Sequence, residues 1–130
     1  FYPMLTDYSV RIPSKNTTQR FKRTALAAIK QCDNPWLPRI NEPLSFKQAI
    51  EKIISEGWIP VLCSEKRPAK KISALPNNIK PCFIIGPEGG FSEAEFAFFN
   101  EKNIFQISIC HHITRAETAA IAVAAQFQLF

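Results

Sequence analysis

Three apolar-rich segments constrain the fold of this chain more than any other feature, and the first two of them contain no polar alternation. They run from Trp58 to Cys63, from Pro81 to Gly86 and from Ile104 to Ile109. A strand that exposes one face to water alternates apolar and polar residues, whereas a strand buried on both faces does not. Segments with helical periodicity flank these runs. The sequence therefore predicts an α/β fold in which helices cover both faces of a parallel sheet.

Capping patterns indicate where several of the helices begin. A capping box places Glu or Gln three residues after a Ser or Thr. Such pairs are Ser45 with Gln48, Ser92 with Glu95, and Thr114 with Glu117. We predict helices over residues 16–32, 45–56, 92–102 and 114–130, with Gly57 as the stop of the second. Residues 2–5 and 9–12 are predicted to be extended.

Size and cysteine usage set limits on the class of protein. A chain of 130 residues forms one domain with a modest core. No apolar run approaches the ~18 residues of a membrane span, and no signal peptide is visible, so we expect a cytoplasmic protein without a membrane partner. The four cysteines are scattered, which argues against a metal site and a disulfide framework. Cys63 and Cys82 lie in apolar runs and are predicted to be buried thiols.

The net charge of +5 favours a polyanionic partner. Basic residues cluster at 20–23 and at 66–71, and the second cluster is predicted to be a loop because it contains a proline and no apolar periodicity. From charge alone, a solvated face is the more common explanation for each cluster. The candidate RNA-binding residues are Arg20, Arg23, Lys66, Arg67, Lys70 and Lys71.

Residues 85–90 read Ile-Gly-Pro-Glu-Gly-Gly and connect a predicted strand to a predicted helix. Glycine lets a ligand approach the backbone closely, although an ordinary strand–turn–helix connection has the same pattern. The spacing matches neither a Walker A loop nor Gly-x-Gly-x-x-Gly, which disfavours nucleoside triphosphates and dinucleotides. Ligands of parallel sheets bind at the carboxyl ends of strands. The three ends expected to meet are Leu62-Cys63, Ile85-Gly86 and Ile109-Cys110.

Two motifs together resemble those of the RsmE family. They are Ile-Gly-Pro-Glu-Gly-Gly-Phe-Ser-x-x-Glu from Ile85 and, after a strand, Ile-Thr-Arg-Ala-Glu-Thr-Ala-Ala from Ile113. That family contains S-adenosylmethionine-dependent methyltransferases of the SPOUT superfamily, which modify N3 of a uridine in 16S ribosomal RNA. The resemblance implies a C-terminal trefoil knot, a homodimer, and 16S rRNA of the small ribosomal subunit as partner. It also implies that residues 1–130 form the methyltransferase domain, without the family's N-terminal part and PUA-like RNA-binding domain.

By the same resemblance, the glycine turn and residues 110–119 form the two walls of an S-adenosylmethionine pocket. Cys110 stands where the family has a glycine, and His112 where it has an arginine, so the Cys110 side chain is expected to crowd the adenine or to shift the backbone. Thr6-Asp7-Tyr8 stands where the family often has Ser-Glu-Arg. The cofactor-binding candidates are Leu62, Ile85, Gly86, Pro87, Glu88, Gly89, Gly90, Ile109, Cys110, Ile113, Arg115, Ala116, Thr118 and Ala119.

Arg115 and Glu117 are the catalytic candidates. Methyl transfer to N3 needs alignment of the reacting atoms and loss of the N3 proton. Arg115 is predicted to position or polarise the uracil, or to hold a phosphate; a surface ion pair with Glu117 or Glu88 is the alternative. Either carboxylate is a candidate base, although the capping-box position of Glu117 favours a role as helix cap. His111 and His112 are adjacent and point apart in a strand, so no metal is expected.

The leading prediction is therefore an S-adenosylmethionine-dependent methyltransferase acting on N3 of a uridine in 16S rRNA. One alternative keeps the cofactor and changes the target to another ribosomal or transfer RNA site. Another is a non-catalytic RNA-binding module, in which Cys110 and His112 mark lost catalysis. Cofactor binding separates the module from both enzyme predictions.

Overall fold

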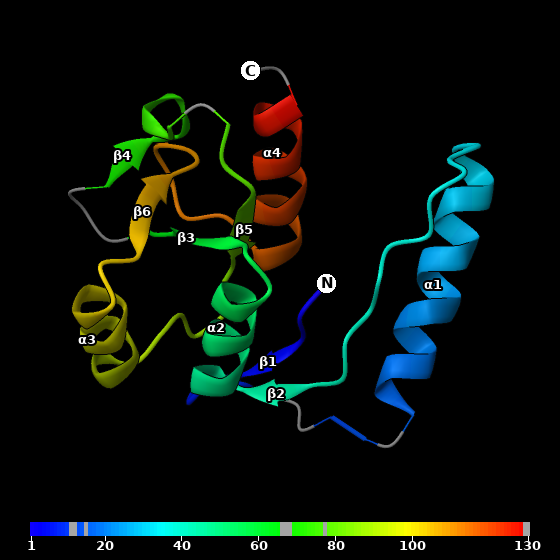
Figure 1. The fold of residues 1–130 in the computed structure, drawn as a ribbon, viewed down its shortest axis with the longest axis horizontal. Coiled ribbons are helices and arrows are strands. Elements are labelled where there is room, and N and C mark those ends of the chain that lie inside the picture. Colours follow the sequence, from blue (N-terminus) through cyan, green and yellow to red (C-terminus); the bar gives the residue numbers. More distant parts are fainter. Residues whose placement is uncertain (11–12, 15, 66–68, 77, 129–130) are drawn as a thin grey trace.

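A parallel four-stranded sheet forms the centre of the molecule, in the order β4, β6, β3 and β5 (Figure 1). The computed structural model describes residues 1–10, 13–14, 16–65, 69–76 and 78–128. The strands are β3 (Ile59–Cys63), β4 (Lys70–Lys71), β5 (Pro81–Ile84) and β6 (Phe105–Ser108). Val61 of the inner strand β3 lies opposite Phe83 on one side and Phe105 on the other. The predicted parallel sheet is confirmed, and the apolar runs form three of its strands.

Helices cover both faces of the sheet. Successive side chains of a strand point to opposite faces, so a strand that is apolar throughout presents apolar groups on both faces, and each face needs a cover. Leu62 and Ile84 pack on α2 (Phe46–Ser55) and α3 (Glu93–Glu101), where they meet Ile50 and Phe99. Val61 and Ile107 pack on the other face, against Val123 of α4 (Ala116–Gln128). The predicted covering of both faces is therefore confirmed.

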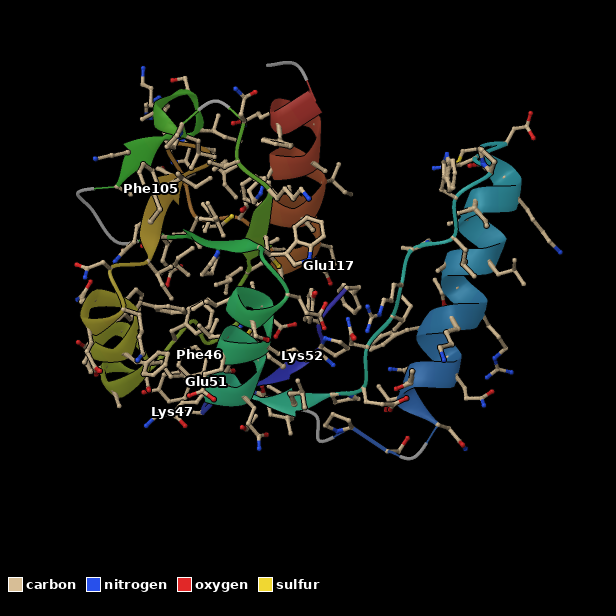
Figure 2. All side chains as sticks on the ribbon, viewed as in Figure 1. Phe46, Lys47, Glu51, Lys52, Phe105 and Glu117 are labelled. Carbon is tan, nitrogen blue, oxygen red and sulfur yellow. The ribbon has the colours of Figure 1, made fainter. Side chains whose placement is uncertain are left out.

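Aromatic rings fill the space between α2 and α3. Phe46 lies between these helices in Figure 2, and its ring centroid is 5.1 Å from that of Phe99 and 5.5 Å from that of Phe98. Phe91 and Phe96 flank the start of α3 and meet edge to face at 6.1 Å. This is the contact of a hydrophobic staple, which fixes the direction in which the chain enters a helix.

The predicted helices are all present, with ends shifted by one or two residues within the described chain. The capping boxes at Ser45 and Ser92 both form. The last helix begins at Ala116 instead of Thr114. The Arg115 carbonyl accepts its first helical hydrogen bond, from the Ala119 amide at 2.9 Å, so Arg115 occupies the cap position predicted for Thr114.

Short strands account for the main differences from the sequence-based expectation. Lys70–Lys71, predicted as loop, pairs with β6 as strand β4 and is followed by a 3-10 turn, η1 (Ile72–Ala74). β1 (Met4–Leu5) and β2 (Leu44–Ser45) pair in a separate parallel sheet. Ser9, predicted as extended, instead closes a turn by donating its amide to the Thr6 carbonyl at 3.1 Å; residues 11–12 lie outside the described residues.

Helix α1 (Thr17–Gln31) stands apart from the α/β body in Figure 1. Thr18 is its buried residue, and the Thr18 hydroxyl donates a hydrogen bond of 2.5 Å to the Glu42 carboxylate. The Phe21 ring meets Phe1 edge to face at 5.5 Å. The Phe21 and Ile29 side chains of α1 are only half-buried.

Candidate functional site

A cavity of about 320 Å³ lies at the carboxyl ends of the central strands. It is lined by residues that follow β3, β5 and β6, which is where ligands of parallel sheets bind. Its volume falls at the lower end of the roughly 300–1,000 Å³ of small-molecule sites. The two motifs singled out in the sequence, which begin at Ile85 and Ile113, both line this cavity.

Most of the cofactor-binding candidates line this cavity. Those that do are Ile85, Gly86, Pro87, Glu88, Gly90, Ile109, Cys110, Ile113, Arg115, Ala116 and Ala119. Leu62, Gly89 and Thr118 are not among the lining residues, and neither is the catalytic candidate Glu117. The cavity thus brings Arg115 together with the glycine turn but leaves Glu117 outside its wall.

The pleat of β3 and the phase of α4 explain these exclusions. Leu62 is fully buried and points toward α2 and α3, so the cavity wall continues from Cys63 instead. In α4, Ala116 and Ala119 are three residues apart and share the face that lines the cavity. Glu117 and Thr118 fall on other faces of the helix, and both are exposed.

The glycines of the turn make room for other parts of the same chain. A Cβ on Gly86 would lie 2.9 Å from the Phe91 ring, and a Cβ on Gly89 would lie 3.0 Å from the Tyr8 Cβ. Gly90 has a φ of +71°, and its amide donates to the Pro87 carbonyl at 2.8 Å. Packing within the protein therefore requires glycine here, in addition to the ligand approach that the sequence suggested.

A hydrogen-bond network anchors the end of the turn to the segment after β1. The Ser92 hydroxyl donates to the Asp7 carboxylate at 2.5 Å. Buried Glu95 accepts from the Ser92 amide at 2.8 Å and from the Asp7 amide at 3.0 Å. This network holds Tyr8 against Gly89. Sequence analysis found the cap of α3 but not its link to Asp7, because the two segments are more than 80 positions apart.

Side chains hold the backbone of the segment after β6 in place by donating hydrogen bonds to its carbonyls. The Cys110 thiol donates to the His112 carbonyl, and the Ser108 hydroxyl donates to the Cys110 carbonyl at 2.9 Å. Gln126 of α4 donates from Nε2 to the Ile109 carbonyl at 3.0 Å. The Cys110 thiol thus bonds to its own wall, although the residue lines the cavity as expected.

Sequence reasoning did not select several residues that also line the cavity. Ser64, Glu65, Phe91, Phe96 and Ser108 were not named for the site at all, whereas Cys63 was named for it only as a strand end, and His111, His112 and Thr114 only as part of the predicted second wall. Most of them are direct neighbours of the predicted strand ends, so extending each end by two residues would have found them. Burial raises the pKa of the Cys63 thiol to about 12, so it is a neutral wall group and not a nucleophile.

The predicted RNA-binding residues fall on opposite sides of the molecule (Figure 1). Arg20 and Arg23 are exposed on α1. Lys70 and Lys71 are exposed on β4, and Lys71 lies opposite the cavity residue Ser108 in the sheet. The Lys70 ammonium also lies 5.1 Å from the centre of the Phe105 ring. Lys66 and Arg67 lie outside the described residues.

Metal ligation, disulfide bonding and a membrane-spanning helix have no support among the described residues. Within the described ranges, no group of three His, Cys, Asp or Glu residues is placed to hold a metal ion. The four cysteines are free thiols, half-buried at Cys63 and Cys82 and exposed at Cys32 and Cys110. No helix among the residues with described structure is long and apolar enough to cross a membrane.

The cavity suits a small ligand with both an aromatic and a charged part. Ile85, Ile109, Ala119 and the Phe91 ring provide apolar walls. Charged side chains come from Glu65, Glu88 and Arg115. Apolar walls with a few placed polar groups are typical of cofactor sites.

Known proteins with similar sequences include RNA methyltransferases. A ribosomal RNA small subunit methyltransferase E from Synechocystis is 32% identical over 130 residues, covering 97% of this chain and 43% of its own. A protein of the same name from Rickettsia conorii is 41% identical over 116 residues, covering 85% of this chain and 46% of its own. The chain therefore spans less than half the length of these two relatives.

A solved structure has the same fold. The crystal structure of a ribosomal RNA small subunit methyltransferase E from Neisseria gonorrhoeae, bound to S-adenosyl methionine, has a TM-score of 0.83 with this chain. The two are 23% identical, and the match covers 98% of this chain and 54% of the other. The family model described as RNA methyltransferase domain matches residues 1–128. This chain belongs to the RNA methyltransferase domain family.

Proposed function

We propose that residues 1–130 are the catalytic domain of an RsmE-type, S-adenosylmethionine-dependent methyltransferase that modifies N3 of a uridine in 16S rRNA. The observation that carries this proposal is the meeting of both motifs of the resemblance in one cavity at the strand ends. The names of the relatives support the rRNA target. The proposal includes a SPOUT-type trefoil knot, a homodimer, a cytoplasmic location and the small ribosomal subunit as partner.

The cofactor would lie between the glycine turn and the start of α4. When bound, it supplies the methyl group that is transferred. The backbone of residues 85–90 and of residues 109–113 provides hydrogen-bonding groups, and the aliphatic side chains Ile85 and Ile109 provide apolar contact. These features suit a compact, bent cofactor with an adenine ring.

Arg115 is the residue that we assign to the target base. It lines the cavity at the cap of α4, and its side chain is exposed. A guanidinium beside the uracil stabilises the negative charge that appears when the N3 proton leaves. Glu88 lines the same cavity, so of the two carboxylates we assign Glu88 to receive the proton. Glu117, in the first turn of α4, interacts favourably with the positive end of the helix dipole instead.

RNA would reach this site from the β4 side. Lys70 and Lys71 are exposed there, beside the wall formed after β6. Flexible, exposed lysines contact phosphates without reading sequence. Arg20 and Arg23 lie too far round the molecule to share that contact, so they would touch a separate part of the RNA (Figure 1).

The test combines cofactor binding with methyl transfer. We expect calorimetry to give micromolar binding of S-adenosylmethionine, about −8 kcal/mol, and we expect methylation of 16S rRNA in small subunits. Arg115→Ala should lower methylation about 100-fold or more while the fold and cofactor binding persist. Arg39→Ala removes an exposed arginine paired at 3.8 Å with Glu56, away from the cavity, and serves as the matched control.

Each other outcome selects a different function. Methylation of another RNA with the same cofactor would support the alternative target. A folded protein without cofactor binding would favour the RNA-binding module. Unchanged turnover in Arg115→Ala would remove that residue from the mechanism.

A further inference from the structure

Glu65 places a carboxylate in the cavity wall that neither motif contains. It follows β3, is exposed, and lines the cavity. A Cβ built on Gly90 would lie 3.0 Å from Glu65 Oε1, so the carboxylate rests against the glycine turn. Among the residues whose structure is described, none forms a hydrogen bond or ion pair with the Glu65 side chain. The group is therefore available to a ligand.

The turn is built in a way that leaves room for this carboxylate. Gly90 has a φ of +71°, which side-chain-bearing residues rarely adopt. Its amide is held by the Pro87 carbonyl at 2.8 Å, so the backbone at Gly90 is fixed. A side chain at this position would occupy the space next to Glu65 Oε1.

The charged groups divide the cavity into an acidic and a basic side. Glu65 follows β3 and Glu88 follows β5, so both carboxylates belong to neighbouring strands. The basic group is Arg115, which belongs to the segment after β6. A ligand that carries an ammonium and a carboxylate on one carbon matches this division, with its ammonium toward Glu65 and Glu88.

We propose that Glu65 binds the α-ammonium of the methionine moiety of S-adenosylmethionine; this rests on the cofactor assignment in the proposed function. A carboxylate accepts hydrogen bonds, and an ammonium donates up to three of them. Such charge-assisted bonds are about twice as strong as neutral ones. The sulfonium has no N–H to donate, so the ammonium is the cationic group that Glu65 holds by hydrogen bonding.

Three ligands and one isosteric variant test the assignment by calorimetry on the whole chain. S-adenosylmethionine and S-adenosylhomocysteine both carry the ammonium, whereas methylthioadenosine lacks the whole amino-acid part. Glu65→Gln should weaken binding of the first two by roughly tenfold or more, as expected for a charged hydrogen bond, and should leave methylthioadenosine within about twofold. Glu51→Gln, at an exposed site on α2, is the matched control (Figure 2).

The remaining outcomes overturn the assignment in distinguishable ways. Equal loss for all three ligands would overturn the assignment, because it would place Glu65 at the adenosine part that they share or in support of the wall. Loss for S-adenosylmethionine alone would place the carboxylate at the sulfonium. Unchanged affinity for all ligands, with binding by the unmodified chain intact, would remove Glu65 but leave the proposed function standing. Absence of binding by the unmodified chain would overturn both.

Discussion

Gly89 meets Tyr8 where the segment after β1 crosses the glycine turn, and this contact gives a prediction for a single residue. Gly89→Val places a Cβ about 3.0 Å from the Tyr8 Cβ, closer than most Cβ contacts, so Tyr8 or the turn has to shift, and the Asp7–Ser92 hydrogen bond resists a shift of Tyr8. We expect the turn to move and S-adenosylmethionine to bind roughly tenfold more weakly or worse, with a persisting fold. Calorimetry with circular dichroism checks this expectation.

Tyr8→Gly provides the matched rescue. It removes the opposing Cβ, so the double variant with Gly89→Val should regain part of the lost affinity. Wild-type affinity in Gly89→Val alone would show that the turn tolerates the added side chain.

The environment of Tyr2 predicts that the stability of the fold depends on pH. Burial, followed by its hydrogen bond of 2.7 Å to Glu56, raises the pKa of the Tyr2 phenol to about 12. Because the pKa in the folded state exceeds the ordinary value near 10, the neutral phenol stabilises the fold below pH 10. That contribution is lost as the pH rises toward and through 12.

Tyrosinate absorbance provides the measurement for Tyr2. We expect a component that titrates near pH 12 in the folded chain and disappears in Tyr2→Phe. We also expect the free energy of unfolding to fall less steeply above pH 10 in that variant. A titration with no late component would contradict the shifted pKa.

Helix α2 shows how a whole element depends on one of its faces. Ile50 and Ile53 are fully buried, whereas Ile54 is 47% exposed on the same helix. Ile50→Ala leaves a cavity among the phenylalanines of α3 and should lower the free energy of unfolding by about 2–5 kcal/mol. Ile54→Ala makes the same chemical change at the surface and should cost less than about 1 kcal/mol.

Urea denaturation of both α2 variants measures this difference. Equal losses of stability would contradict the arrangement in which α2 packs its Ile50 face on the sheet. A large loss at Ile54 alone would indicate that another surface covers the exposed side of α2.

For the molecule as a whole, the separation of α1 from the α/β body predicts uneven stability. α1 has Thr18 as its buried residue, whereas α2 contributes Phe46, Ala49, Ile50 and Ile53 to the core. A helix of 15 residues is marginal in water without packing. We therefore expect the amides of α1 to exchange with solvent well before those of α2 and α3.

Hydrogen exchange followed by mass spectrometry tests the expectation for α1. Protection of α1 equal to that of α2 at all protein concentrations would contradict it. Protection that rises with protein concentration would instead show that a second copy covers the helix.

The sequence by itself determined the layers of the fold and the place of the site. Apolar runs such as Trp58–Cys63 predict buried parallel strands, and capping pairs such as Ser92 with Glu95 predict the start of a helix. Both signals are local, because they depend on residues within one strand or one helical turn. The carboxyl ends of the strands then indicate where a ligand binds.

Tertiary structure decided which side chains meet at that site. Lys70–Lys71 became a strand because the edge of β6 was available for pairing. The pleat of β3 turns Leu62 into the core and away from the cavity. Glu65, which follows β3, lines the cavity because its carboxylate lies beside Gly90. The link from Asp7 to Ser92 joins positions 85 residues apart. Such contacts depend on how distant segments pack in three dimensions, and local periodicity carries no information about that packing.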